Sequence, residues 1–444
     1  MATTTSLEAS VEARLSTVRQ EAHQWRSGGQ QFTIFRVPAD VRESNRTSYE
    51  PRVVSIGPYY HGATSLRAME DQKWRYLDDL LCRNASVSSS LLIQEMRSLE
   101  PRARSCYSER PDLDSDDFVR MLLLDACFIL EFYFKWYGKE PDALCDVGWG
   151  LTFIHTDLLL LENQIPFFVV ERLYGVVAGP QGDRETLVNL FLEYIGDEKP
   201  IERPSATFEI HHLLHLYYES FVPKRRPQTS AAAGRKKKKK KKLIPRATEM
   251  SAAGVTFRQR ALAQDMYDVA FDGRTGVMQI PAVLIDEMKR SQLLNLLAFE
   301  QSQGAEEANV VTSYVFLMSL LIRTVRDVEL LSRRGILENL LANDEEAARF
   351  FSHLGDCGTM NFKHQVFAGL YDDVRGYCDS WWHRNRAAFK RDYFSSPWSA
   401  ISFGVAGFVV VLTAIQSYFT RESREATEPK RSANASDKKK IKIR

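Results

Sequence analysis

Apolar residues recur at helical spacing over most of the chain. This periodicity predicts helices over 66–83, 116–136, 156–174, 186–195, 208–221, 285–300, 308–332, 336–341, 344–354 and 362–393. The 116–136 segment is apolar almost all round, so we expect it at the centre of the fold. Asp157 is expected near the start of its helix, where a carboxylate suits the helix dipole, and Pro166 predicts a break in that helix.

Shorter apolar runs, bounded by glycines and prolines, interrupt this helical pattern. Residues 32–35 and 53–58 read as extended segments and turns. Strands are predicted at 255–257, 266–271 and 277–280, around a turn at 272–276 that carries Gly273 and Gly276. The expected fold class is therefore mainly α, with a large helical domain and a small β element.

Near the C-terminal end of the sequence, residues 399–419 carry no charge. A helix of that length spans about 31 Å, close to the ~30 Å hydrocarbon core of a bilayer. Trp398 and Tyr418 stand where aromatic interface residues belong. A buried core helix is the alternative, but such a helix is rarely followed by 25 polar and charged residues. The pattern favours one transmembrane helix over 398–419 and a basic tail over 420–444.

These features divide the rest of the chain into two parts. A variable, loosely amphipathic N-terminal helix is expected within 1–31, and the large domain within 32–396. That domain contains a low-complexity, lysine-rich insert over 223–246, which is expected not to bury apolar surface and is predicted to be disordered.

The formal net charge is only +2, yet eight consecutive basic residues stand at 235–242 and nine more basic residues in the tail. The remaining chain is therefore acidic, and a folded nucleic-acid-binding face is not expected. The lysine run could be a nuclear or nucleic-acid-binding patch or a contact to anionic lipid; the default interpretation is a solvated loop.

Signatures of common enzymes and metal sites are absent from the sequence. It contains no nucleophile elbow, P-loop or dinucleotide-binding glycine pattern, and none of its six cysteines forms a Cys-x-x-Cys pair. His211 and His215 have the i, i+4 spacing of two zinc ligands, but His212 stands where a metalloprotease carries its glutamate. We expect an amphipathic helix with partly exposed histidines, no metal and no cofactor.

Four carboxylates stand in apolar surroundings: Asp125, Asp157, Glu162 and Glu300. Paired buried carboxylates can perform acid–base chemistry, but they more often accept hydrogen bonds that tie segments together. Because Asn163 and Gln164 follow Glu162 directly, we expect a structural network here, reaching to the 54–62 turn. The alternative is an unrecognised enzyme that uses Asp125, Glu162 or His61 in a cleft.

The order of short motifs resembles a plant family known as domain of unknown function 247. The motifs that carry the resemblance are Val37-Pro38, Tyr49-Glu50-Pro51, 54–62 (VSIGPYYHG), Met69-Glu70 with Lys73, Leu124-Asp125, 127–131 (CFILE), 157–168 (DLLLLENQIPFF), 253–257, Ile280-Pro281, Asn295, 298–300, Asp327-Val328, 393–394 and 397–398. Tyr60 and Ala126 depart from the usual His and Gly of the family, so neither position is taken as a site. The resemblance implies a plant membrane protein with one C-terminal span and no established catalytic residues. Some members are linked to self-recognition in grass self-incompatibility, others to growth or stress responses.

The sequence and the resemblance together favour a membrane-anchored, non-enzymatic recognition or signalling module. Its expected partners are the bilayer, through 398–419, and an unidentified protein. Small residues at 400, 404, 407, 411 and 414 form a stripe that could support self-association of the span. The expected location is the plasma membrane or an endomembrane. Because the span would leave the ribosome only as synthesis ends, we expect the large domain on the cytosolic side, although the flanking charges mildly favour the opposite orientation.

Overall fold

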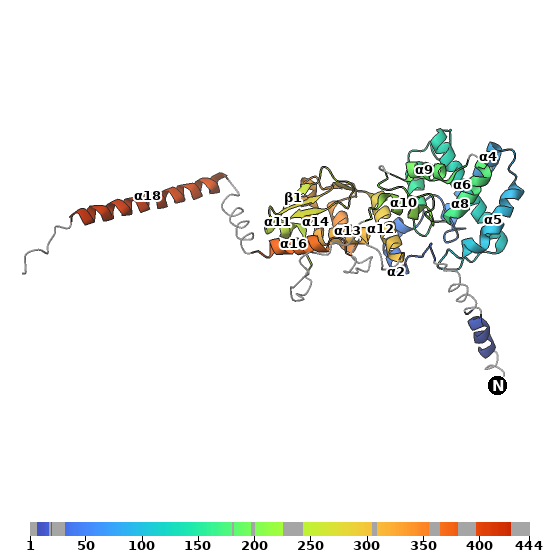
Figure 1. The fold of residues 1–444 in the computed structure, drawn as a ribbon, viewed down its shortest axis with the longest axis horizontal. Helices are drawn as coiled ribbons and strands as arrows, with labels where there is room; N and C mark the ends of the chain where they lie inside the picture. The colour runs from blue at the N-terminus through green and yellow to red at the C-terminus, as the bar shows by residue number, and fades with distance from the viewer. Residues whose placement is uncertain are drawn as a thin grey trace, which may run out of the picture. The chain divides into compact units, whose positions relative to one another are not determined.

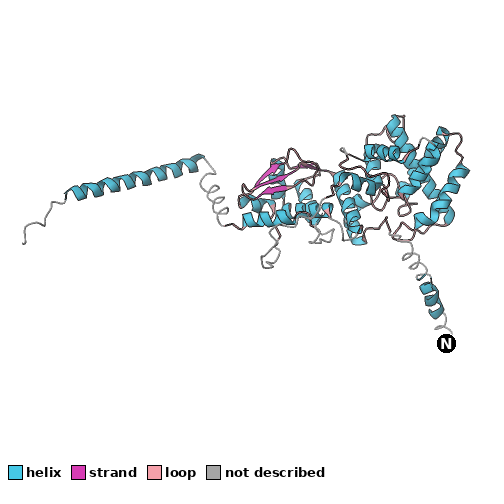
Figure 2. Ribbon diagram, viewed as in Figure 1, coloured by secondary structure: helices cyan, strands magenta, loops and turns pink. Residues whose placement is uncertain are grey.

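The computed structural model describes residues 7–16, 19, 32–179, 182–196, 200–224, 243–303, 309–354, 365–380 and 397–427 (Figure 1). The chain forms two compact units, one of Met1–Glu249 with Thr256–Gly376 and one of Met250–Val255 with Tyr377–Arg444. Both are mainly helical and the few strands are short, as Figure 2 shows by colour. The predicted mainly α fold class is confirmed.

Helix α6 (Ser115–Gly138) is the central helix of the N-terminal half of the larger unit. Asp114 begins it by accepting a hydrogen bond from the N–H of Asp117, and Lys139 ends it in a left-handed conformation. Fifteen of its residues are buried, as its apolar pattern predicted. The helices packed against it are α4 (Arg67–Arg83), α5 (Ser89–Arg104), α8 (Phe167–Ala178) and α9 (Arg184–Ile195).

The predicted helix over 156–174 is two helices. Helix α7 (Gly150–Leu158) ends before an irregular stretch, and α8 begins directly after Pro166. The break at Pro166 is therefore confirmed. The expected position of Asp157 at a helix start is wrong, because Asp157 lies in the last turn of α7, where its carboxylate serves other backbone N–H groups.

The second half of the larger unit combines helices with two small sheets. Its helices are α10 (Leu213–Phe221), α12 (Glu287–Ser302), α13 (Val310–Leu321), α14 (Val325–Arg333) and α15 (Asp344–Leu354). The larger unit also contains the short helices α2 (Ala39–Ser44), α3 (Arg46–Tyr49) and η1 (Thr64–Leu66). Helices α11 (Ala247–Ala252) and α16 (Ala368–Cys378) lie at the boundaries between the two units.

The first sheet has the strand order β1-β3-β2 and contains β1 (Thr256–Gln259), β2 (Ala270–Asp272) and β3 (Val277–Ile280). Strands β2 and β3 pair antiparallel across the predicted turn, whereas β1 pairs parallel to β3. A second sheet pairs β4 (Val283–Ile285) parallel to β5 (Leu337–Asn339). The helix predicted over 336–341 is therefore wrong, because residues 337–339 form β5.

Several other boundaries also differ from the prediction. Residues 208–212 precede α10 without being helical, and the helix expected over 308–332 divides into α13 and α14. Helix α5 was not predicted. The extended segment at 32–35 contributes a single bridge, from Ile34 to Tyr107. Within the predicted N-terminal helix, residues 7–16 are helical.

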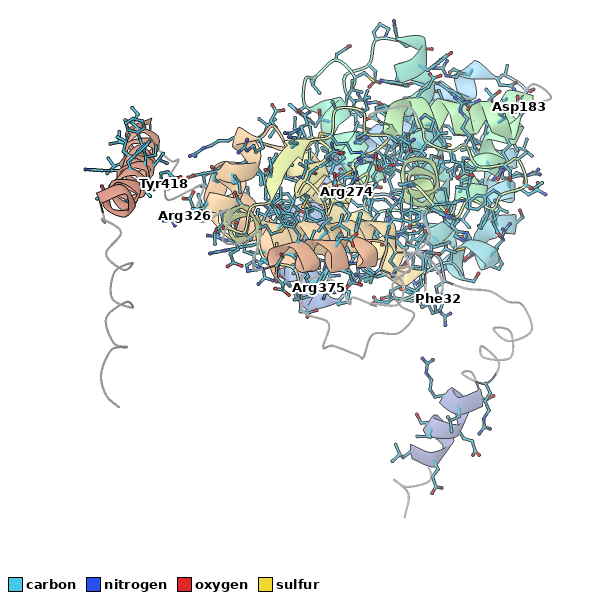
Figure 3. The ribbon with its side chains drawn as sticks, turned by 60° about the vertical axis from the view of Figure 1, so that its left-hand side comes forward. Phe32, Asp183, Arg274, Arg326, Arg375 and Tyr418 are labelled. Carbon is cyan, nitrogen blue, oxygen red and sulfur yellow. The ribbon has the colours of Figure 1, made fainter. Side chains whose placement is uncertain are left out.

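The C-terminal helix α18 (Pro397–Thr427) covers the predicted span and continues eight residues beyond it into charged sequence. Tyr418, labelled in Figure 3, is 66% exposed, and Val410 is 68% exposed. Across the described ranges, however, no helix combines the length and the apolar character needed to cross a membrane, so the assignment of 398–419 as a transmembrane helix is not supported. Self-association of this helix stays a prediction. Most of the lysine-rich insert, 225–242, and the tail beyond Thr427 lie outside the described residues.

Candidate functional site

Five buried polar side chains of the larger unit gather beneath residues 52–62, here called the 52–62 segment. Asp125, Asp157, Glu162, Asn163 and Gln164 are each at most 2% exposed. A buried polar group without a partner destabilises the fold, so each of these groups is expected to have one. The hydrogen bonds of these five side chains define the candidate site.

Asp157 and Asn163 hold the first part of the segment. The Asp157 carboxylate accepts the backbone N–H groups of three consecutive residues, 52–54, at 2.9, 2.7 and 2.9 Å. Asn163 Oδ1 accepts the N–H of Ile56 at 2.7 Å, while its Nδ2 donates to the carbonyls of Val54 and Asp157. Burial raises the pKa of Asp157 to about 6, against the three N–H groups, which act to lower it. Both side chains therefore act as backbone anchors.

Lys73 and Asp125 form a buried ion pair below the middle of the segment. Lys73 is fully buried, and its Nζ lies 2.6 Å from Asp125 Oδ1, 2.6 Å from Glu70 Oε1 and 2.7 Å from the carbonyl of Ser55. The second oxygen of Asp125 accepts the N–H of Gly57 at 2.7 Å. Burial acts to lower the pKa of Lys73, but the charges of Asp125 and Glu70 raise it above its ordinary value. Lys73 therefore stays protonated and joins α4, α6 and the 52–62 segment.

Gly57 allows the segment to approach this network. Its φ is +81°, a conformation that favours glycine. A Cβ at this position would lie 2.2 Å from the carbonyl oxygen of Gln164. The side chain of Gln164 in turn donates to the carbonyls of Leu158 and Leu160 and accepts the N–H of Leu213. The predicted architectural role of the Glu162-Asn163-Gln164 block, with a link to the 54–62 turn, is confirmed in its geometry.

Glu162 holds the far end of the segment. Its carboxylate accepts the N–H of Val37 at 2.8 Å and the hydroxyl of Tyr60 at 3.1 Å, and it pairs with Arg42 at 3.2 Å. Burial, followed by the charge of Glu162, raises the pKa of Tyr60. The carboxylate is therefore shared by three different parts of the chain.

The outer side of the segment carries half-buried Tyr59, Tyr60 and His61. The guanidinium of Arg36 lies 4.7 Å from the centre of the Tyr59 ring and donates to the Tyr59 carbonyl. Tyr59 also accepts the N–H of Glu109 through its hydroxyl. His61 Nδ1 is 4.0 Å from Glu70 Oε2. This outer face, of Arg36, Tyr59, Tyr60 and His61, presents aromatic and basic groups on a backbone fixed from below.

A second polar network lies in the other half of the unit. Glu300 accepts the N–H groups of Val311 and Thr312 and the hydroxyl of Tyr218, and its burial raises its pKa. Asp327 closes a capping box with Thr324 and accepts the N–H of Thr248. Both groups tie helices together, as the sequence predicted for Glu300.

Sequence reasoning missed the roles of Lys73 and Asn295. Asn295 accepts the N–H of Leu161 and donates to the carbonyl of Ser48, which connects α12 to both α3 and the 157–168 block. The available signal was a polar residue in an otherwise apolar helix face. Lys73 shares its face of α4 with Met69, Tyr76, Leu77 and Leu80, all buried.

The histidine cluster differs from the prediction. Helix α10 begins after His212, which caps it by accepting the N–H of His215 and bonds to the carbonyl of Thr33 through Nε2. His212 and His215 are buried rather than partly exposed. Because the helix begins at Leu213, His211 precedes it, and His211 and His215 are not two positions on one helix face. His215 Nδ1 accepts the N–H of His211, and burial lowers the pKa of His211 to about 4. Within the described part of the chain, no group of three or more His, Cys, Asp or Glu side chains could hold a metal ion.

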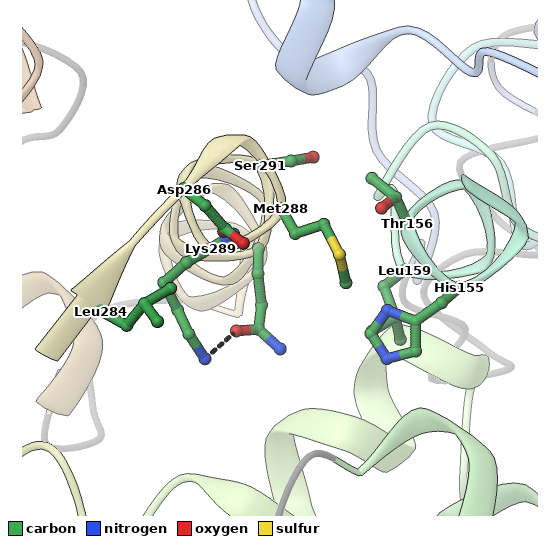
Figure 4. A pocket seen from close by; sticks show the side chains of 9 residues that line it. His155, Thr156, Leu159, Leu284, Asp286, Met288, Lys289 and Ser291 are labelled. Carbon is green, nitrogen blue, oxygen red and sulfur yellow. Dashed lines mark hydrogen bonds between the residues drawn. The ribbon is translucent and has the colours of Figure 1, made fainter. Parts of the chain in front are cut away.

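The cleft in Figure 4 lies between α7, β4 and α12 and has a volume of about 220 Å³. Its lining includes Leu159, Leu284 and Met288, with the polar groups of His155 and Lys289. Lys289 Nζ donates to Gln292 at 2.7 Å, and His155 Nε2 lies 3.0 Å from the carbonyl of Ile195. None of the candidate enzyme residues Asp125, Glu162 and His61 lines this cleft.

Comparisons with known proteins agree with the motif pattern. The model of the family described as plant protein of unknown function, domain of unknown function 247, matches residues 34–412. UPF0481 protein At3g47200 of Arabidopsis thaliana is 30% identical over 420 residues, covering 88% of this chain and 86% of its own length. Putative UPF0481 protein At3g02645 of the same plant is 21% identical, covering 87% and 89%. No solved structure matches the chain. The chain therefore belongs to the plant family of domain of unknown function 247.

Proposed function

We propose that the protein is a non-enzymatic recognition module whose 52–62 segment presents a fixed surface to a protein partner. The observation that supports it most is the use made of the buried carboxylates. Both oxygens of Asp157 accept hydrogen bonds from backbone N–H groups. One oxygen of Asp125 accepts a hydrogen bond from Lys73 and the other from the N–H of Gly57. Groups engaged in this way order a backbone in advance of binding, which lowers the entropic cost of recognition.

The competing enzyme hypothesis needs a proton-transfer group next to a nucleophile. One such group is the Ser55 hydroxyl, which donates to Glu70 Oε1 at 2.9 Å and lies 3.4 Å from Lys73 Nζ. Glu70 Oε1 also accepts a hydrogen bond from Lys73 at 2.6 Å. A general base must be able to lose its proton near the working pH, but the pKa of Lys73 is raised. Ser55 is also only 1% exposed. These features favour the recognition hypothesis.

The recognition hypothesis is tested with a variant on the outer face. His61→Ala removes a half-buried ring that contacts the network only at 4.0 Å from Glu70, so the melting temperature should change little. The matched control is His211→Ala, another half-buried histidine. In plant membranes, the wild type and His211→Ala should cross-link to the same partner proteins. His61→Ala should no longer cross-link to them. An unchanged set of cross-linked proteins would overturn the proposal.

We also propose that the apolar surface of α18 is covered by lipid, with the large unit on the cytosolic side of the membrane. Apolar side chains are exposed around this helix, including Phe408 at 64% and Val411 at 55%. Contiguous exposed apolar surface of this kind marks a binding face. The full chain should sediment with membranes after carbonate extraction, and a chain ending at residue 396 should not. Equal extraction of the two chains would contradict this proposal.

A further inference from the structure

A second pocket of about 220 Å³ lies on the opposite side of α12 from the residues that line the first. One face of α12 contributes Met288, Lys289 and Gln292 to the cleft of Figure 4, whereas Arg290 and Leu294, four residues apart, line the second pocket. The remaining lining comes from Ser44, the last residue of α2, from Asn45, which follows it, and from α15. We propose that this pocket binds a small soluble ligand that carries a phosphate group and an apolar part.

Two guanidinium groups provide the charge for such a ligand. Arg290 is held in place by Glu346 and Glu287, 3.3 and 3.6 Å from its Nη1. The centre of the Phe350 ring lies 5.4 Å from its guanidinium carbon. Its Nε is buried and has no hydrogen-bond partner among the described residues. Because this atom is buried, the guanidinium of Arg290 acts on the pocket through its charge. Arg290 is thus fixed before binding.

Arg349 supplies the second guanidinium, and it is exposed. The ion pairs of the described residues include none from this side chain. Guanidinium groups match the paired oxygens of phosphate through two parallel hydrogen bonds. Glu346 in the lining and Glu287 outside it both pair with Arg290. Arg349 is therefore the positive charge of the lining that favours an anion.

The other lining residues indicate the rest of the ligand. The Ser44 hydroxyl and the Asn45 amide add polar groups, while Leu294, Phe350 and Leu354 provide an apolar side. Ligand pockets commonly combine such apolar walls with a few polar groups that fix orientation. A phosphate monoester of an aromatic or aliphatic alcohol fits this combination better than inorganic phosphate alone.

The direct test is calorimetric titration of the purified full chain in detergent with phenyl phosphate, and with phenol as the uncharged comparison. Phenyl phosphate should bind saturably at one site, and phenol should bind at least tenfold more weakly. Arg349→Ala should weaken phenyl phosphate binding at least tenfold without lowering the melting temperature, because Arg349 is exposed. Arg333→Ala is the matched control, since Arg333 is an exposed arginine on α14 outside the pocket; it should bind like the wild type.

Two results would overturn the proposal. One is no saturable binding of phenyl phosphate up to ~10 mM; the other is equal affinity in the wild type and in Arg349→Ala. A second binding experiment, with phosphatidic acid vesicles, distinguishes a soluble ligand from a lipid headgroup. If the protein ignores phenyl phosphate but binds phosphatidic acid vesicles only when Arg349 is present, the ligand is a lipid, and the soluble class proposed here is wrong.

Discussion

Replacing Lys73 with methionine tests the buried ion pair beneath the 52–62 segment. The substitution keeps much of the side-chain volume but removes three short contacts from Nζ, to Asp125, Glu70 and the Ser55 carbonyl. Asp125, 1% exposed, would keep its bond to Gly57 but lose its counter-ion. Removing one partner of a buried ion pair destabilises proteins by about 3–5 kcal/mol, partly because the remaining charge stays buried.

Protonation of Asp125 sets an upper limit to this loss. Once neutral, the carboxyl group no longer carries an unpaired buried charge. The loss is then at most the cost of binding that proton at pH 7, about 4 kcal/mol for a carboxyl with an ordinary pKa, together with about 1–3 kcal/mol for the Ser55 carbonyl left without a donor. We therefore expect Lys73→Met to lower the free energy of unfolding by about 3 kcal/mol at pH 7. Lys73→Met/Asp125→Leu should lose less than the sum of the two single variants, because the double variant has no unpaired charge.

The assay is urea unfolding of the full chain in mild detergent, followed by circular dichroism. Lys289→Met is the matched control, because it is the same substitution in another helix of the same unit, where Lys289 is partly exposed and donates to Gln292. It should cost less than about 1 kcal/mol. If the two lysine variants lose equal stability, Lys73 does not join α4, α6 and the 52–62 segment as described.

Three further perturbations test other parts of the structure. First, Asp157 has a pKa of about 6 in the folded protein, above its ordinary value of 3.8. The folded state therefore binds more protons between these values, and the stability contributed by this group falls as pH rises through that window. Urea unfolding at pH 4.5 and pH 7 should show a steeper loss of stability for the wild type than for Asp157→Asn, and parallel losses would refute this. Second, Gly57→Ala should prevent stable folding, because its Cβ would meet the Gln164 carbonyl. Gly62 has a φ of +78° and open space around it, so Gly62→Ala should lower the free energy of unfolding by only about 1–2 kcal/mol. Similar melting temperatures for the two variants would be contrary to the structure. Third, deletion of 227–242 should leave the melting temperature nearly unchanged, because loop length adds little closure entropy; a drop of several degrees would show that the insert packs.

Local patterns predicted much of the fold. The apolar run of α6, the helical spacing of α4, the turn glycines between β2 and β3 and the break at Pro166 are encoded in neighbouring residues, and all four are present. Helix α5 was not predicted from the sequence, and its last turn contains Pro101. Residues 336–341 were assigned to a helix because the four apolar residues among them, at 336, 337, 340 and 341, have helical spacing. The pairing of β5 with β4 joins residues more than fifty positions apart.

The candidate site could be predicted only in part for the same reason. Polar residues that follow four leucines need hydrogen-bond partners if they are buried, so the Glu162-Asn163-Gln164 block predicted a hydrogen-bond network. Which groups meet there depends on packing between distant helices. The Lys73–Asp125 pair joins α4 to α6 across 52 positions, and Asn295 reaches the 157–168 block from α12. No local spacing contains that information.

Hydrogen exchange of the backbone amides in the 52–62 segment tests the central claim most directly. The N–H groups of Val53, Val54, Ile56 and Gly57 donate to the buried side chains of Asp157, Asn163 and Asp125, although the segment has no regular secondary structure. These amides should therefore exchange as slowly as those of α6, and far more slowly than the loop around Leu262, which is 93% exposed. Asn163→Ala should speed exchange at Ile56. Exchange of the 53–57 amides at the rate of the Leu262 loop in the wild type would contradict a segment fixed in advance by the buried network.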